Sequence, residues 1–124
     1  MNFTSPDFER YMDLSNLELK LTAQNMANVD TPGYRTVGFD FEAEMKRSMA
    51  ELTSQKGPED ADRNSVTAGV QVKETDGLLE RPDGNNVSMD REGLKMAEAQ
   101  LRFNVGEKLA KDEFSGILQA IQVK

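Results

Sequence analysis

The side chains of this sequence that could do chemistry are carboxylates and amides, because its 124 residues include no cysteine and no histidine. Their absence removes disulfides, thiol nucleophiles, serine–histidine triads and ordinary zinc sites. Asp83, Asn85, Asp90 and Glu92 could offer oxygen ligands to a cation. Val87, however, stands where an EF-hand loop needs an oxygen ligand, so we expect no calcium site.

Catalysis by paired carboxylates has little support as well. Glu42 and Glu44 are two residues apart, but the chain holds 22 acidic residues, and most of them must form a solvated surface. We therefore expect no enzyme, no cofactor, no metal and no small-molecule substrate.

Composition excludes further classes of protein. The net charge is −7 and no basic patch is present, which argues against nucleic-acid binding and against an anionic-membrane surface helix. Residues 36–87 contain 6 basic and 11 acidic residues, so the acidity is concentrated in the middle. The segment Met1–Asp7 lacks the basic start and apolar run of a secretory signal, and no stretch approaches the ~18 apolar residues of a membrane span.

The first long element expected is a helix from about Pro6 to Asn28, with Ser5 as its N-cap and acidic residues in its first turn. Steps of 100° place its apolar residues in two separate stripes. One stripe contains Phe8, Met12, Leu19, Ala23 and Met26, and the other contains Tyr11, Leu14, Leu17 and Leu21.

A second long helix is expected from about Met89 to the C-terminal end, capped by Ser88. We expect it to run through Gly106 at a cost of ~1 kcal/mol and to fray or bend at Gly116. Its apolar residues also form two stripes. The first contains Leu94, Ala97, Leu101, Val105 and Leu109; the second contains Met89, Met96, Ala99, Phe103, Ala110, Phe114, Ile117, Leu118 and Ile121.

The middle of the chain has a different character. Residues 46–66 are expected to form a polar loop, and Val70–Val72, with Val66 in phase, alternates like a short strand. The sequence therefore predicts a mainly α fold, in which the terminal helices pack as an antiparallel coiled-coil-like pair. The predicted organisation joins residues 1–35 and 88–124 as one helical unit, and residues 36–87 form a loop-rich middle with little β structure.

Two stripes on each helix predict assembly. A two-helix hairpin buries one stripe per helix, and exposing several large apolar side chains is a solubility liability. Other subunits could cover the second stripes. The alternative is a compact monomer whose middle segment covers them.

Two segments of the sequence resemble known signatures. Ala23 to Tyr34, AQNMANVDTPGY, resembles the N-terminal signature of the flagellar rod, hook and hook-associated axial proteins. Arg81 to Val87, RPDGNNV, with the following MDRE, resembles the C-terminal signature of one basal-body rod member of that family. The chain length and the stretch from Lys111 to Ile121 fit the same member.

The motif residues also have a local structural interpretation. Thr31, Pro32, Gly33 and Tyr34 predict a type II turn that ends the first helix, and Pro82 and Gly84 predict a second tight turn. Asn25 and Asn28 are expected to bond backbone groups that the ending helix leaves free. Asn85 and Asn86 lead into the N-cap of the last helix.

The resemblance implies a function that composition and spacing do not give. It implies a structural subunit of the proximal rod of the flagellar basal body, which polymerises through its terminal helices and forms part of the drive shaft and of the export-channel wall. It also implies other rod subunits, a rod–ring adaptor and membrane-ring components as partners, and passage through the type III export apparatus without cleavage.

The residues expected at subunit interfaces are the large apolar side chains of both helices. They are Phe8, Tyr11, Met12, Leu14, Leu17, Leu19, Leu21, Met26, Leu94, Ala97, Leu101, Phe103, Val105, Leu109, Phe114, Ile117, Leu118 and Ile121. A competing hypothesis is a cytosolic helical adaptor or chaperone-like hairpin that binds a partner helix.

Overall fold

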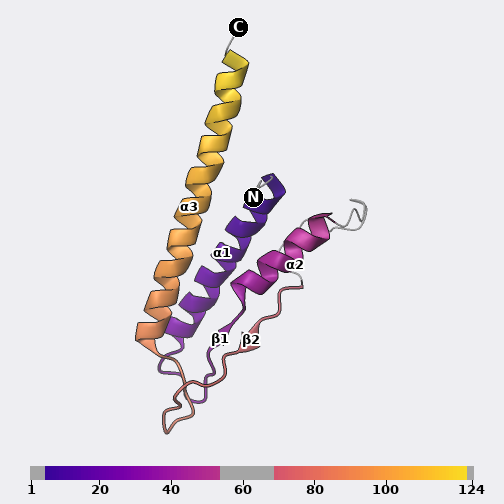
Figure 1. The fold of residues 1–124 in the computed structure, drawn as a ribbon. Coiled ribbons are helices and arrows are strands. Elements are labelled where there is room, and N and C mark those ends of the chain that lie inside the picture. Colours follow the sequence, from indigo (N-terminus) through magenta and orange to yellow (C-terminus); the bar gives the residue numbers. More distant parts are fainter. Residues whose placement is uncertain (1–4, 54–68, 123–124) are drawn as a thin grey trace.

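Two long helices dominate the fold. The computed structural model describes residues 5–53 and 69–122, in which α1 spans Ser5–Ala27 and α3 spans Met89–Gln122. They run antiparallel along each other (Figure 1). The predicted fold class and the start of the second long helix are confirmed, and α3 continues through Gly106 and Gly116 to Gln122. Ser5, predicted as the N-cap of the first helix, lies within α1 and is the first residue that the structure describes.

The two helices differ in length. At 1.5 Å per residue, α1 is about 35 Å long and α3 about 51 Å long. Figure 1 shows α3 continuing beyond the point at which α1 begins. The C-terminal turns of α3 therefore extend past the described part of α1.

A third helix occupies the middle segment. α2 spans Phe41–Thr53 and packs on α1, so that α1 lies between α2 and α3 (Figure 1). The prediction of a loop over residues 46–66 is wrong for residues 46–53, and its remainder falls on residues 54–66, outside the described residues. Asp40 caps α2, since its Oδ1 accepts from the backbone N–H of Ala43 at 3.2 Å, and Glu42 and Glu44 lie in the first turn.

The described β structure is one two-stranded antiparallel sheet. β1, Val37–Gly38, pairs with β2, Lys73–Glu74, in the register Val37 with Glu74 and Gly38 with Lys73. The predicted strand at Val70–Val72 is therefore displaced to the residues that follow it, while Val66 lies outside the described residues. β1 also contacts α1, which places the sheet beside the end of that helix.

The core lies between the three helices. Leu14 of α1, Met45 of α2 and Ala99 of α3 are buried. Tyr11 packs edge-on against Phe41, with ring centroids 5.4 Å apart. The second apolar side of α1 is thus covered within the chain by α2, which is the arrangement that the compact-monomer alternative expected for this helix.

Candidate functional site

The turn that follows α1 is held by Asn85, a residue from a distant part of the sequence. The side-chain amide of Asn85 donates to the carbonyl oxygens of Asn28 at 2.9 Å, Val29 at 3.0 Å and Thr31 at 2.8 Å. The guanidinium of Arg81 also donates to the Val29 carbonyl. All three carbonyls belong to the turn that follows α1, so Asn85 satisfies backbone acceptors of that turn.

The two predicted turns pack against each other. Gly33 and Gly84 have φ angles of 75° and 85°, a conformation that favours glycine. Gly33 donates its backbone N–H to the Asp83 carbonyl at 2.8 Å. A Cβ atom on Gly84 would lie 3.3 Å from the Cα of Gly33. The two signature segments are therefore one physical unit, which we call the joint: residues 25–37 together with residues 81–92.

Asn25 lies at the centre of the joint and is buried. Its Nδ2 donates to the Val37 carbonyl at 2.8 Å and to Oε2 of Glu92 at 3.0 Å. Its Oδ1 accepts from the Val37 N–H at 3.1 Å and from the Tyr34 hydroxyl at 2.9 Å. The prediction that Asn25 bonds the ending helix is wrong, because its partners lie in β1, the turn and α3; the side chain of Asn28 does bond α1, at the Gln24 carbonyl, at 2.8 Å.

Glu92 is the joint residue that sequence reasoning missed. The sequence suggests it only as an oxygen ligand for a cation, yet its side chain is fully buried, one turn inside α3. Its spacing places it on the same side of α3 as the buried residues Ala99 and Gly106, and this spacing could have predicted its burial. Within the described residues, no group of three or more acidic side chains is placed to hold a metal ion.

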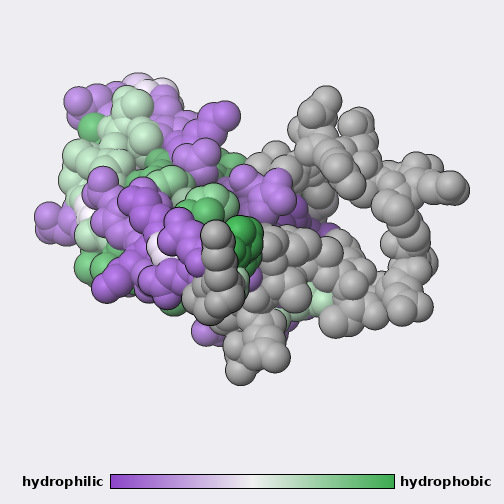
Figure 2. All heavy atoms as spheres, turned by 90° about the horizontal axis from the view of Figure 1, so that it is seen from above, coloured by the Kyte–Doolittle hydropathy of each residue, from purple (hydrophilic) through white to green (hydrophobic). Residues whose placement is uncertain are grey.

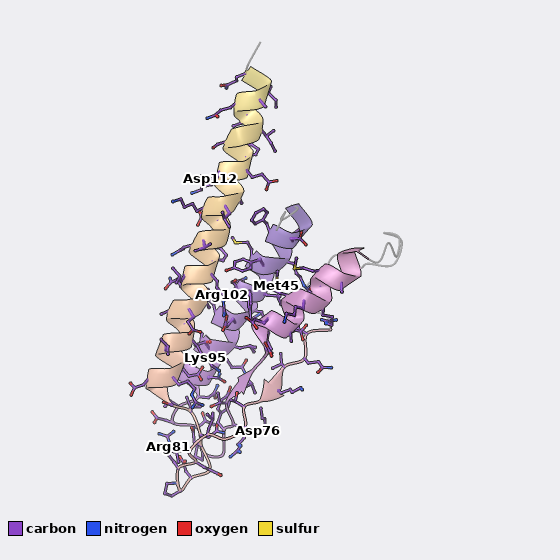
Figure 3. The ribbon with its side chains drawn as sticks, in the orientation of Figure 1. Met45, Asp76, Arg81, Lys95, Arg102 and Asp112 are labelled. Carbon is purple, nitrogen blue, oxygen red and sulfur yellow. The ribbon has the colours of Figure 1, made fainter. Side chains whose placement is uncertain are left out.

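Asn86 and Thr36 complete the joint. The Thr36 N–H donates to Oδ1 of Asn86 at 2.7 Å, and the Val87 N–H donates to Oδ1 of Asn85 at 2.8 Å. The joint thereby fixes the end of α1, the start of β1 and the start of α3 relative to one another. Figure 3 shows Arg81 among these loops, beneath the end of α1.

Beyond the joint, α1 and α3 are held at close distance by Gly106. A Cβ atom there would lie 2.8 Å from Sδ of Met12 and 3.1 Å from the ring of Tyr11. Arg102 of α3 forms a 2.6 Å ion pair with Glu18 of α1. Its guanidinium also lies 4.3 Å from the centroid of the Phe41 ring, so one side chain connects all three helices.

Two carboxyl groups, Asp13 of α1 and Glu44 of α2, have shifted pKa values. Burial of the side chain and then the charge of Glu9 raise the pKa of Asp13, and Arg10 opposes them only in part. Burial also raises the pKa of Glu44, but hydrogen bonds from Arg47 and from the Gln71 N–H, with the positive charges nearby, outweigh it and hold the pKa below its ordinary value.

The predicted interface residues of α1 are covered within the subunit. Leu14 is buried, and Phe8, Tyr11, Met12, Leu17, Leu19, Leu21 and Met26 are half-buried. Among its described side chains, α1 has no large apolar residue that is strongly exposed.

In contrast, α3 presents much exposed apolar surface. Phe103 is half-buried on the side that faces α1, whereas Leu101 is 65% exposed and Ile121 is 74% exposed. Figure 2, which views the molecule from the end where α3 finishes, shows apolar side chains at the surface among polar ones. Large apolar residues of α3 that are exposed are Met89, Leu94, Leu101, Val105, Leu109, Phe114, Ile117, Leu118 and Ile121.

An apolar groove of about 300 Å³ lies where α3 runs past the start of α1. Phe8 and Met12 of α1 and Phe114 and Ile117 of α3 contribute its apolar walls, together with Ala110. None of the helices that the structure describes is long and apolar enough to span a membrane.

Comparison with known proteins identifies the family. No protein-family model matches the chain. Over 112 residues the chain is 29% identical to the flagellar basal body rod protein FlgB of Salmonella typhimurium, covering 83% of this chain and 81% of that protein. Identity is 25% over 118 residues to FlgB of Borrelia hermsii, covering 87% of both chains. It is 30% over 107 residues to FlgB of Cereibacter sphaeroides, covering 82% of this chain and 80% of that protein. The chain belongs to the FlgB family of flagellar basal body rod proteins.

Proposed function

We propose that this chain is a structural subunit of the proximal rod of the flagellar basal body and that it polymerises through its terminal helices. In the assembled rod it forms part of the drive shaft and of the wall of the export channel. It reaches that position through the type III export apparatus, without cleavage of a signal peptide. Its neighbours are copies of itself, other rod subunits, the rod–ring adaptor and components of the membrane ring.

The observation that supports assembly most strongly is the exposed apolar surface of α3. Leu94, Leu101 and Val105 lie on one side of the helix, away from α1, and no described element covers them. Burying one Leu side chain contributes about 1.5–3 kcal/mol. Several such residues on one face give assembly a large free-energy gain.

The joint supports the same function in a different way. A rod that transmits torque needs subunits whose helices keep a fixed relative position. Asn25, Asn85 and Glu92 connect the end of α1 with the start of α3 through buried hydrogen bonds, and Arg102 connects the helices further along.

The test is the location of the subunit in a cell that depends on it. When the gene is deleted, we expect cells without hook or filament and without motility. When an epitope-tagged copy is restored, we expect it in detergent-extracted basal bodies. Recovery of the tagged chain only from the cytoplasm, as a small soluble oligomer, would instead indicate the adaptor or chaperone-like function.

A further inference from the structure

The exposed apolar residues of α3 form two patches at different heights. The outer patch consists of Leu94, Leu101, Val105 and Leu109, and the terminal patch consists of Phe114, Ile117, Leu118 and Ile121. Successive residues of a helix are turned by about 100°, so Leu101 and Ile117 point about 160° apart. The two patches therefore lie on nearly opposite sides of the same helix.

The terminal patch continues the side of α3 that packs on α1. Ala99 and Gly106 are buried against α1, and Ile117 follows them on the same side at a spacing of 18 and 11 residues. Beside Phe8 and Met12, where α1 begins, this side opens into the apolar groove. Within the described residues, this side of α3 stays exposed where the helix runs past the described part of α1.

The outer patch has the chemistry to cover this surface. Within the described residues, α1 offers no strongly exposed large apolar side chain, which leaves α3 as the helix with an apolar face to donate. The groove is bordered by two carboxylates, Glu9 and Glu113. Between its ends the outer patch is flanked by two cationic residues, Lys95 and Lys108, and one acidic residue, Glu98.

We infer that the outer patch of one copy packs into the groove and onto the terminal patch of the next copy. This inference rests on the proposed function, and it names the contact through which copies polymerise. Placing Leu101 of one copy level with Ile117 of the next displaces the copies by 16 residues, or about 24 Å along α3.

The geometry of this contact specifies the type of assembly. Two different surfaces meet, so the contact is heterologous. In a row of copies, the copy at one end keeps a free outer patch and the copy at the other end keeps a free groove. Heterologous contacts that do not close into a ring continue as a helical filament. A closed two-fold dimer would need the same patch on both copies.

Disulfide trapping tests the contact directly, because the chain has no cysteine of its own. Two alleles with different tags are expressed together in cells that depend on this chain, one with Leu101→Cys and the other with Ile117→Cys. Basal bodies are isolated, oxidised and examined for a dimer that contains both tags. A disulfide forms only when the two Cα atoms approach to about 4.4–6.8 Å.

Gln119→Cys provides the matched control for Ile117→Cys. Gln119 is exposed in the same two turns of α3, and its position is turned by about 160° from that of Ile117. We expect at least a tenfold higher yield of mixed dimer for the pair of positions 101 and 117 than for the pair 101 and 119.

Four results would overturn the inference. Equal yields for the two pairs would show that the contact is not specific. A dominant dimer between two Leu101→Cys copies would show a two-fold interface between outer patches. Basal bodies that contain both alleles but yield no mixed dimer would reject this contact while leaving the proposed function intact, whereas absence of both alleles from motile cells' basal bodies would reject both.

Discussion

Asn25 in the last turns of α1 donates a 3.0 Å hydrogen bond to the buried carboxylate of Glu92, 67 residues further along the chain in the first turns of α3. The same amide pairs with both backbone groups of Val37. One side chain thus satisfies the backbone of β1, the Tyr34 hydroxyl and a buried acid of α3. Removing it leaves several polar groups without a partner in a site that water does not reach.

We therefore predict that Asn25→Ala destabilises the subunit strongly. The loss should be about 3 kcal/mol, because the Glu92 carboxylate and the N–H and carbonyl groups of Val37 lose their partner while buried. Urea unfolding of the purified chain measures it. Asn16→Ala, at an exposed position of the same helix, should change the free energy of unfolding by about 0.5 kcal/mol or less. Equal stability of the two variants would show that the Asn25 hydrogen bonds contribute nothing.

A second prediction concerns the hydrogen bonds that Asn85 makes to the turn that follows α1. Asn85→Ala should lower the free energy of unfolding by about 1–2 kcal/mol, since three carbonyl oxygens lose a donor. Asn85→Asp should cost more than Asn85→Ala, because a carboxylate has no hydrogen to donate and repels the carbonyl oxygens of Asn28, Val29 and Thr31. Thermal unfolding of both variants decides the order, and a less harmful Asp would contradict these hydrogen bonds.

The turn motifs and the long helices were predictable because their signals are local. Gly33 and Pro32 specify a turn by their own dihedral preferences, and the spacing of apolar residues marks the long helices. The partner of a buried amide is not local. Whether Asn25 bonds its own helix or Glu92 depends on the tertiary arrangement, which periodicity does not describe.

The missed helix α2 has a similar explanation. It buries polar side chains, Glu44 and Ser48, beside Met45, so its inner face lacks the continuous apolar stripe that marked the other helices. Asp40 and the acidic residues after it did signal a helix start. The residues that follow are largely polar, a composition that favours a loop.

Two glycines of α3, Gly106 and Gly116, provide a matched pair for a third prediction. Gly106→Ala places a methyl group 2.8 Å from Sδ of Met12 and 3.1 Å from the ring of Tyr11, whereas Gly116→Ala meets no atom within 4 Å. Replacing Gly116 should stabilise the purified subunit by up to about 1 kcal/mol through helix propensity. Replacing Gly106 should leave it at least about 1 kcal/mol less stable than Gly116→Ala, owing to overpacking. Urea midpoints that coincide would contradict the close approach of α1 and α3.

Stability should depend on pH through Asp13. Burial raises the pKa of this carboxyl above its unfolded value, so its ionised form costs stability at neutral pH, and the cost disappears as pH falls through the folded pKa. Asp13→Asn should therefore be more stable than the wild type at pH 7 and equal to it below the unfolded pKa of about 3.8. Unfolding curves between pH 3 and pH 7 test this, and an advantage of Asp13→Asn that persists at pH 3 would contradict it.

Glu44→Gln should show the opposite sign. The lowered pKa of Glu44 means that its ionised form stabilises the fold above the unfolded pKa, and this contribution is lost as pH falls through the folded pKa. The variant should be less stable than the wild type at pH 7, and the difference should vanish in acid. A constant difference across the titration would show that charge is not its cause.

The decisive comparison uses two positions of α3, Leu101 and Phe103. Leu101 is exposed in the single subunit and Phe103 faces α1. Phe103→Asp should therefore destabilise the purified chain by about 3 kcal/mol, because it removes an aromatic ring from the side that faces α1 and places a charge at a half-buried position. Leu101→Asp should leave the stability of the purified chain within about 0.5 kcal/mol of the wild type, as a surface substitution does.

The most direct measurement is the amount of Leu101→Asp subunit in isolated basal bodies, relative to the exposed control Gln100→Asp. Both variants should fold and be made at wild-type levels. We predict that Gln100→Asp is incorporated and supports swimming, while Leu101→Asp is absent from basal bodies and the cells are non-motile. Incorporation of Leu101→Asp at the level of the control, with normal swimming, would show that the exposed face of α3 is not buried in the rod.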